Sequence, residues 1–270
     1  GTRVRNCGLP DHSGVEGVEV TQVYRAMRAL MSAVLVLLWG IPAQAATLHV
    51  GPGLSLRSPS EAARVAQAGD VVLIEPGLYA GDTAVWTQKR LRIASAGGPV
   101  VLEAAGRHAE GKAIWVMRGG EFEVEGIEFR GARVPHGNGA GIRFESGRLV
   151  IRNCVFRDNE NGILTSNDRQ AELHVVDSEF ADAPRDSRAL HHLLYAGSIA
   201  ELKVSGSRFH NGYNGHLLKS RAARSDLRFN LLVDGPTGKA SYEAEFPNGG
   251  HVVMIGNVIG ESAASGNAHL

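Results

Sequence analysis

The sequence is poor in several kinds of residue whose abundance marks a class of protein. Aromatic residues make up 6% of the 270 residues, too few for a β-sandwich packed on large rings. Lysine plus arginine (28) equals aspartate plus glutamate (28), so the chain lacks the basic field of a nucleic-acid-binding protein. Only two cysteines occur, without the paired spacing of a structural zinc site. What remains is a neutral chain long enough for one domain with a substantial core.

Long apolar runs are missing as well. The stretch Ala29–Ile41 has about a dozen residues, which is too short to span a bilayer. It follows the basic start Met27-Arg28 and precedes the small-x-small site Ala43-Gln44-Ala45. This pattern predicts a secretory signal peptide over residues 27–45, cleaved after Ala45, with a retained membrane anchor as the alternative.

Residues 1–26 show no periodic pattern, and we interpret them as leader translated from too early a start codon. The predicted mature chain starts at Ala46 and carries 24 basic and 25 acidic residues. We expect it to be periplasmic or secreted, monomeric, and free of the membrane after signal cleavage. Cys7 falls in the leader, so Cys154 stands alone and no intramolecular disulfide can form. A small thiol stacked in a turn is the interpretation we favour for it.

One frame of eight residues returns along the chain. It reads apolar, any, apolar, any, turn residue, any, any, apolar, with a degenerate copy at Ser225–Leu232. The closing apolar residues are separated by 27, 24, 29, 23 and 27 residues. The clear copies are Phe122–Phe129, Leu149–Phe156, Leu173–Phe180, Leu202–Phe209 and Val252–Ile259.

Alternation within each copy indicates a strand with one buried face, and the spacing indicates units that bury this face by stacking. The fifth position holds residues that tolerate a left-handed backbone, namely Gly126, Asn153, Asp177, Gly206 and Gly256. A bend recurring between two short strands predicts an all-β fold, a right-handed parallel β-helix. Leucine-rich and WD-type repeats are excluded because their signatures are absent.

The first coil begins with a predicted helix. Ser58-Pro59-Ser60-Glu61 forms a capping-box start, and Gly69 is expected to end the helix. The helix would cover the strand edges of the first coil. The order of GPG at 51–53 and SPSEAARVAQAGDVVLIEPGLY at 58–79 resembles the opening of secreted β-helix proteins of the pectate-lyase-like superfamily. That resemblance implies the fold and says little about chemistry, because the fold hosts lyases, hydrolases, epimerases and adhesins.

The β-helix domain is predicted to occupy residues 46–262, followed by an unstructured tail at 263–270 with no visible terminal cap. A second strand precedes each later copy of the frame. Strict alternation in it places the second residue inside and the first, third and fifth outside. These strands are Gly141–Glu145, Gly162–Ser166, His192–Ala196, His216–Ser220 and Ser241–Glu245.

The outward row of this second sheet gathers titratable side chains. With coils about 4.8 Å apart, His192 and His216 would lie nearly one above the other, and Glu243 one coil further on. Such crowding shifts pKa values and suits proton transfer, and a hydrogen-bonded polar ladder is the structural alternative. The whole row is Arg143, Glu145, His192, His216, Glu243 and Glu245.

Lys219 and Arg221 are the second feature of this region. Alternation places Lys219 inside, beneath Tyr195, where an unpaired ammonium would be costly, so we expect a bulge or a carboxylate partner. Arg221 falls at the strand end and would lean over a surface groove. Asn214 and the loop at 133–138, which includes His136, are expected to flank this groove and contact a substrate.

An acidic-sugar lyase needs a cation that neutralises the uronate carboxylate, a base and an acid. The neutralising cation would be Arg221 or Arg143, the base Lys219 or His216, and the acid Tyr195 or His192. The segment GHLLKSRAARSDLRFNLLVDG at 215–235 resembles, in layout, the part of alginate lyase and chondroitinase B type β-helix lyases that carries the catalytic lysine. By position Arg221 matches that lysine, and the next coil offers glutamates where those lyases have an arginine.

We therefore predict a polysaccharide-active protein, favouring β-elimination on an acidic polymer. A non-catalytic carbohydrate-binding or surface protein is the alternative, and a glycoside hydrolase using Glu243 and Glu245 is the third interpretation. No cofactor or metal is predicted. These glutamates could hold calcium, but no calcium-loop motif supports it.

Overall fold

The structure is a computed structural model that describes residues 1–3, 8, 24–25, 45–185, 190–265 and 267. The leader and signal-peptide predictions fall almost entirely outside the described residues. Residues 1–44 and Ala45–Leu270 form separate units, and everything below concerns the second. In the part of the chain that is described, no helix has the length and apolar character needed to cross a membrane.

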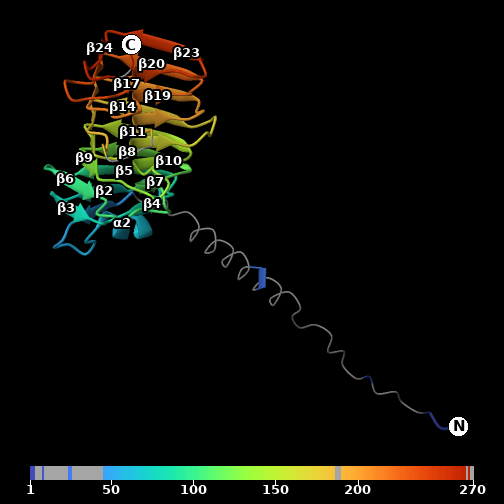
Figure 1. The fold of residues 1–270 in the computed structure, drawn as a ribbon. Coiled ribbons are helices and arrows are strands. Elements are labelled where there is room, and N and C mark those ends of the chain that lie inside the picture. The colour runs from blue at the N-terminus through green and yellow to red at the C-terminus, as the bar shows by residue number, and fades with distance from the viewer. Residues whose placement is uncertain (4–7, 9–23, 26–44, 186–189, 266, 268–270) are drawn as a thin grey trace. The chain divides into compact units, whose positions relative to one another are not determined.

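The second unit is a right-handed parallel β-helix of about eight coils, as the repeat predicts (Figure 1). Its three parallel sheets are called A, B and C. Sheet A contains β1 (Thr47–Val50), β2 (Val71–Ile74), β5 (Arg90–Ser95), β8 (Gly120–Glu125), β11 (Gly147–Arg152), β14 (Glu172–Val176), β17 (Glu201–Ser205), β20 (Arg224–Arg228) and β23 (His251–Ile255).

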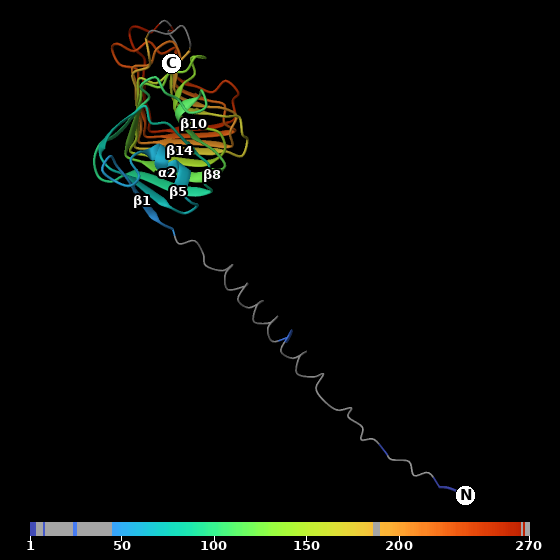
Figure 2. The same ribbon diagram turned by 90° about the horizontal axis from the view of Figure 1, so that it is seen from below.

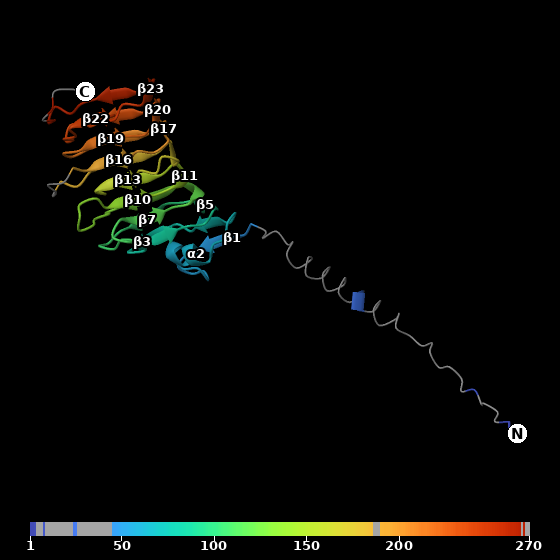
Figure 3. The ribbon, with the colours of Figure 1, turned by 90° about the vertical axis from the view of Figure 1, so that its right-hand side faces the viewer.

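Sheets B and C complete each coil. Sheet B contains β3 (Gly77–Ala80), β6 (Val100–Glu103), β9 (Ile127–Arg130), β12 (Val155–Arg157), β15 (Glu179–Ala181), β18 (Arg208–His210), β21 (Leu231–Val233) and β24 (Val258–Gly260). Sheet C contains β4 (Ala84–Trp86), β7 (Ala113–Met117), β10 (Ala140–Phe144), β13 (Asn161–Thr165), β16 (His192–Ala196), β19 (His216–Ser220) and β22 (Tyr242–Glu245). Figure 3 shows the sheet C strands from β7 to β22 stacked in this order.

The bend between sheets A and B is left-handed in every copy of the frame. Asn153 (φ 49°) and Asp177 (φ 48°) occupy it beside the glycines. Phe229 takes the same conformation (φ 56°) in the degenerate copy, where an L side chain with Cβ is disfavoured. The predicted bend positions are therefore confirmed. The glycines are Gly126 (φ 71°), Gly206 (φ 61°) and Gly256 (φ 64°).

The residue after the bend forms a buried ladder of side chain to backbone bonds. Cys154 N–H donates to Ser178 Oγ at 3.2 Å, and Ser178 N–H donates to Ser207 Oγ at 3.1 Å. Asn230 and Asn257 continue the ladder. Burial raises the pKa of the Cys154 thiol to about 12, so the thiol is inert in the folded protein. The stacked, unpaired thiol expected from the sequence is observed.

The closing residues of the frame stack through the core. Ring centroids of Phe129, Phe156, Phe180 and Phe209 follow each other at 5.1, 4.7 and 4.7 Å, with nearly parallel planes. Leu232 continues this column fully buried. Each coil buries its apolar face only against its neighbours, which is the source of stability in a solenoid.

The two ends of the β-helix are finished differently. Helix α2 (Pro59–Val65) contacts β1 and β4, and Figure 2 shows it at the first-coil end. Glu61 accepts a bond from Arg57 N–H, whereas the Ser58 hydroxyl makes no capping bond, and the helix ends at Val65 rather than near Gly69. The chain that follows β24 has no helix or strand among its described residues. Side chains there bind the carbonyls of Ala240 and Ser241.

Sheet C corrects the predicted facing of several side chains. Two consecutive residues of β16, Leu193 and Leu194, both lie in the core, so alternation restarts one residue late. Tyr195 consequently packs on the outer face, and its registered neighbour Lys219 lies beside it. The prediction that Lys219 and Tyr195 face inward is wrong. The prediction that Tyr242, the second residue of Ser241–Glu245, faces inward is also wrong, because Tyr242 pairs in register with His216.

Candidate functional site

A hollow of about 300 Å³ lies on the outer face of sheet C, where β10, β13 and β16 meet the flanking loops. Three of the residues proposed from the sequence line it: Arg143, His192 and Tyr195. Tyr195 and Leu164 pack in an apolar cluster separate from the core. The remaining lining residues are Asn138, Asn161, Thr165, Asn167, Leu190 and Gly197.

His192 and His216 stack as expected from consecutive coils. Their ring centroids are 4.7 Å apart at 15°, and Tyr242 continues the stack at 5.5 Å. Both histidines are buried, with 6% of each residue exposed. Tyr242 therefore takes the place that the sequence reasoning gave to Glu243.

Hydrogen bonds define the protonation of this pair. His192 Nδ1 accepts the backbone N–H of His216 at 3.1 Å, so its ring proton lies on Nε2. The two Nδ1 atoms are 2.9 Å apart, which is a hydrogen bond when His216 carries its proton there. Burial lowers the pKa of His192 to about 3, and the charges of His216 and Lys219 add to this effect. Burial also lowers the pKa of His216, against the opposing charge of Glu245.

Tyr195, Lys219 and Glu245 occupy one outward column on three successive strands. Lys219 Nζ lies 2.6 Å from Glu245 Oε2 and 5.8 Å from the centre of the Tyr195 ring. The carboxylate partner expected for Lys219 is thus present, on the outer face. Arg221 Nε donates to Tyr195 Oη at 2.9 Å, and Arg221 also donates to Asn248.

Arg143 lies in the same column, two strands before Tyr195, with Leu164 between them. Within the described residues, no carboxylate oxygen comes within 4.0 Å of its guanidinium, and its Nε is buried without a hydrogen-bond partner. Burial lowers the pKa of Arg143, with the Glu145 charge opposing. A desolvated guanidinium without a partner, in a hollow, is arranged to receive an anionic group.

The loop at 131–139 borders the hollow and is held from the next coil. The buried Glu160 carboxylate accepts the N–H groups of Val134 and Gly139, at 3.1 and 2.6 Å. Asn138 of this loop lines the hollow, whereas His136 is exposed. Asn214 has a left-handed backbone (φ 59°) just before β19 and does not line the hollow.

Glu243 is not part of the surface. Only 1% of it is exposed, and neither carboxylate oxygen has a hydrogen-bond partner among the described residues. Burial raises the pKa of this carboxyl, and the charges of Asp234 and Glu261 raise it further. The prediction that Glu243 faces outward and binds substrate is therefore wrong, and the pair with Glu245 is not formed on one face.

Sequence reasoning missed two of the amides that line the hollow, Asn161 and Asn167, whereas Asn138 belongs to the predicted flanking loop at 133–138. Asn161 is the registered neighbour of His192, so aligning NGILT with HLLYA from their first residues would have placed it there. Asn167 holds the neighbouring turn by accepting the Ser198 N–H at 2.9 Å. Each of these amides offers both hydrogen-bond donors and an acceptor to a polar ligand.

A larger hollow of about 780 Å³ opens beside sheet A. It is lined by charges of both signs that pair with each other, such as Arg90 with Glu121 and Arg148 with Glu172, each at 3.8 Å. We place the site on sheet C despite the smaller hollow there, because three of its polar residues (Asn161, Thr165 and His192) are buried and Arg143 is without a partner among the described residues.

Comparison with known proteins supports the fold. No family model matches the chain. The SHC SH2 domain-binding protein 1 homolog A of Xenopus laevis is 28% identical over 166 residues, which cover 60% of this chain and 22% of that protein. The crystal structure of pectate lyase Pel9A matches with a TM-score of 0.50 and 15% identity, over 78% of this chain and 58% of that chain. The fold is the pectate-lyase-like parallel β-helix.

Proposed function

We propose that this chain acts on an acidic polysaccharide by β-elimination at the outer face of sheet C. The observation that carries the proposal is the unpartnered guanidinium of Arg143 in the same hollow as Tyr195 and His192. The fold likeness to a pectate lyase supports it, since that enzyme is named for an acidic polysaccharide.

Arg143 would neutralise the uronate carboxylate. Elimination removes the proton from the carbon next to this carboxylate, and the charge that builds up spreads onto the carboxylate oxygens. A partly buried guanidinium that has no protein partner among the described residues stabilises that charge with little reorganisation. Arg221 is the weaker candidate for this role, because its donors are taken up by Tyr195 and Asn248.

Proton transfer falls to Tyr195. Acting in its deprotonated form, with Arg221 donating to Oη, Tyr195 takes the proton from the carbon next to the carboxylate and passes it to the leaving glycosidic oxygen. His192 keeps its proton on Nε2 and can donate a hydrogen bond to this oxygen as the bond breaks. The carbon–oxygen bond breaks as the carbon–carbon double bond forms, so the products are an unsaturated uronate and a free hydroxyl. Lys219 is engaged by Glu245 and His216 does not line the hollow, so neither is the preferred base.

The glycoside hydrolase interpretation loses its support. A pair of carboxyl groups must flank the glycosidic bond, and Glu243 lies inside the β-helix while Glu245 binds Lys219.

The proposal is tested by incubating the protein with pectate, alginate and glycosaminoglycans while the ultraviolet absorbance of unsaturated uronate is followed. We expect absorbance to rise on at least one of these polymers and not on a neutral glucan. Binding to a uronate polymer without new absorbance would contradict elimination and support a non-catalytic carbohydrate-binding protein. Neither binding nor turnover on any polymer would overturn both.

A further inference from the structure

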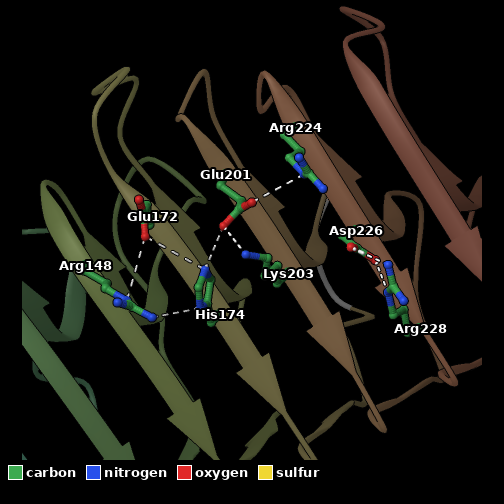
Figure 4. Close-up of polar contacts among 8 residues, drawn as sticks. All are labelled: Arg148, Glu172, His174, Glu201, Lys203, Arg224, Asp226 and Arg228. Carbon is green, nitrogen blue, oxygen red and sulfur yellow. Dashed lines mark hydrogen bonds and ion pairs between the residues drawn. The ribbon is translucent and has the colours of Figure 1, made fainter.

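A second cluster of functional groups lies on the outer face of sheet A, remote in topology from the groove of sheet C. Glu172 and His174 project from β14, and Glu201 projects from the adjacent β17 (Figure 4). One donor atom of each lies within 4.8 Å of the other two. In the described part of the chain, this is the set of three acidic, histidine or cysteine side chains that meets so closely.

We propose that Glu172, His174 and Glu201 form a binding site for a divalent transition-metal ion of the zinc type, which competes with the Lys203 ammonium. The proposal is independent of the polysaccharide-directed function.

The donor spacing fits a small tetrahedral ion. His174 Nε2 lies 3.0 Å from Glu201 Oε2 and 4.0 Å from Glu172 Oε2. Zinc–ligand distances of about 2.0–2.2 Å place tetrahedral ligands roughly 3.3–3.6 Å apart. The two separations from His174 are within about 0.5 Å of this spacing, and the Glu172 and Glu201 donors lie within 4.8 Å of each other, so three donors and a water can share one ion.

The hydrogen bonds around His174 also allow a metal ion at Nε2. This nitrogen contacts Glu201, while Nδ1 faces Arg148. Metal binding at Nε2 moves the imidazole proton to Nδ1, which lies 3.4 Å from Arg148 Nη2. Arg148 must then turn away, and at 51% side-chain exposure it is free to do so.

Lys203 occupies the position that a metal ion would take next to Glu201. Its Nζ lies 2.6 Å from Glu201 Oε2, the same oxygen that meets His174. The Lys203 side chain is 45% exposed, so the ammonium can return to water at little cost. Arg224, 3.5 Å from Glu201 Oε1, stays as a partner of the other oxygen. A metal ion and the Lys203 ammonium therefore exclude each other. The most specific prediction of the proposal is that removal of this ammonium tightens metal binding.

The donor set selects the class of ion. An imidazole nitrogen with two carboxylate oxygens suits zinc and its neighbours, whereas calcium and magnesium prefer all-oxygen sites with more ligands. Zinc is accordingly the probe, and magnesium is the control ion.

Isothermal titration of the whole protein with zinc tests the proposal. We expect His174→Ala and Glu201→Gln to weaken the strongest zinc site by more than roughly tenfold. We expect Lys203→Ala to tighten it, because a competing cation is removed. The matched control is His210→Ala: His210 Nε2 meets Glu179 at 2.8 Å on sheet B in the same kind of contact, and Glu179 also binds Arg157. This variant should leave the affinity unchanged.

Far-ultraviolet circular dichroism establishes that each variant is folded. The nitrogen shift of His174 Nε2 on zinc addition gives a second readout that does not depend on affinity. The proposal is overturned if wild type and Lys203→Ala both bind no zinc. It is also overturned if His174→Ala binds as tightly as wild type, or if Lys203→Ala weakens binding.

Discussion

The outer faces of sheets A and C both carry charged or titratable side chains, but these side chains differ in their burial and in their pairing. On sheet A, arginines of one strand meet glutamates of the next, as Arg92 meets Glu125 at 2.6 Å and Arg152 meets Glu123 at 3.3 Å. These side chains are between 31% and 46% exposed. On sheet C, His192 and His216 are buried, and Arg143 has no partner among the described residues.

The difference indicates which outer face of the β-helix can carry a functional site. A lattice of exposed, mutually paired charges keeps a flat sheet soluble and contributes little energy per pair. Desolvated groups without partners destabilise the fold, so their presence on a surface calls for a function. For this reason we propose the polysaccharide site on sheet C. On sheet A, His174 interrupts the alternation of charge and contacts Glu201 at 3.0 Å.

The largest expected effect separates the two faces by activity. Arg143→Ala and Tyr195→Phe should each reduce elimination by about 10²-fold or more, because a charge-neutralising group or a proton-transfer group is lost. Arg92→Ala on sheet A removes the same charge and should leave the rate unchanged. The measurement is the initial rate of unsaturated-uronate absorbance on the preferred polymer. If Arg92→Ala reduced the elimination rate as much as Arg143→Ala does, the proposed difference between the two faces would be wrong.

Acid should destabilise the protein through the histidine pair of sheet C. The pKa of His192 falls from its ordinary 6.5 to about 3 on folding, so the unfolded chain binds more protons below pH 6.5. Stability is complete above this pH and is lost as pH falls toward 3, by up to about 1.4 kcal/mol per pH unit. Urea unfolding between pH 7 and 4 measures the slope.

The control for this slope is a pair of variants. His192→Gln should flatten it, while His136→Gln in the exposed loop should not. A wild-type slope that survives in His192→Gln would mean that the buried pair is not its source.

The interior carboxyl of Glu243 should destabilise the protein at neutral pH. Its pKa is raised, so the folded state holds the proton more tightly, and stability present below the ordinary pKa of 4.5 is lost as pH rises. Glu243→Leu should therefore stabilise the protein by about 1–3 kcal/mol at pH 7, and by less at pH 4. Glu245→Leu, two residues along the same strand, is the matched control and should not stabilise. The measurement is the free energy of unfolding of both variants by chemical denaturation at pH 7 and pH 4.

The smallest effect is expected on sheet A. Arg92→Ala or Glu125→Ala should lower the free energy of unfolding by less than about 1 kcal/mol, because the pair is exposed and screened. The loss should shrink further in high salt. A salt-independent loss of several kcal/mol, measured by urea unfolding, would show that the paired lattice is structural after all.

The architecture could be predicted from the sequence because each recurring position of the repeat frame has to meet a single physical requirement. Asn153 and Asp177 tolerate the left-handed bend, and the closing phenylalanines need a stacked neighbour. Such requirements recur once per coil, so register between coils could be read from the bends. The stack of His192 on His216 followed from this register, whereas the burial of the two rings did not.

The facing of sheet C could not be read in the same way. Two successive leucines, Leu193 and Leu194, are both apolar and both buried, and no residue type marks where alternation restarts. Lys219 was placed on the wrong face for this reason. Glu243 was placed on the wrong face because the predicted strand started at Ser241, whereas Tyr242 is the residue that pairs with His216. The hollow itself depends on loop residues such as Asn138, whose position is fixed by Glu160 of the next coil. Contacts of this kind are tertiary and leave no periodic signal.

The central claim is that an acidic polysaccharide lies on the outer face of sheet C. A crystal structure with a bound uronate oligosaccharide, on the Tyr195→Phe variant to prevent turnover, tests it most directly. The account predicts a sugar carboxylate at the Arg143 guanidinium and a glycosidic oxygen within reach of His192 Nε2. An oligosaccharide seated instead among the paired charges of sheet A, with the hollow beside Tyr195 unfilled, would contradict it.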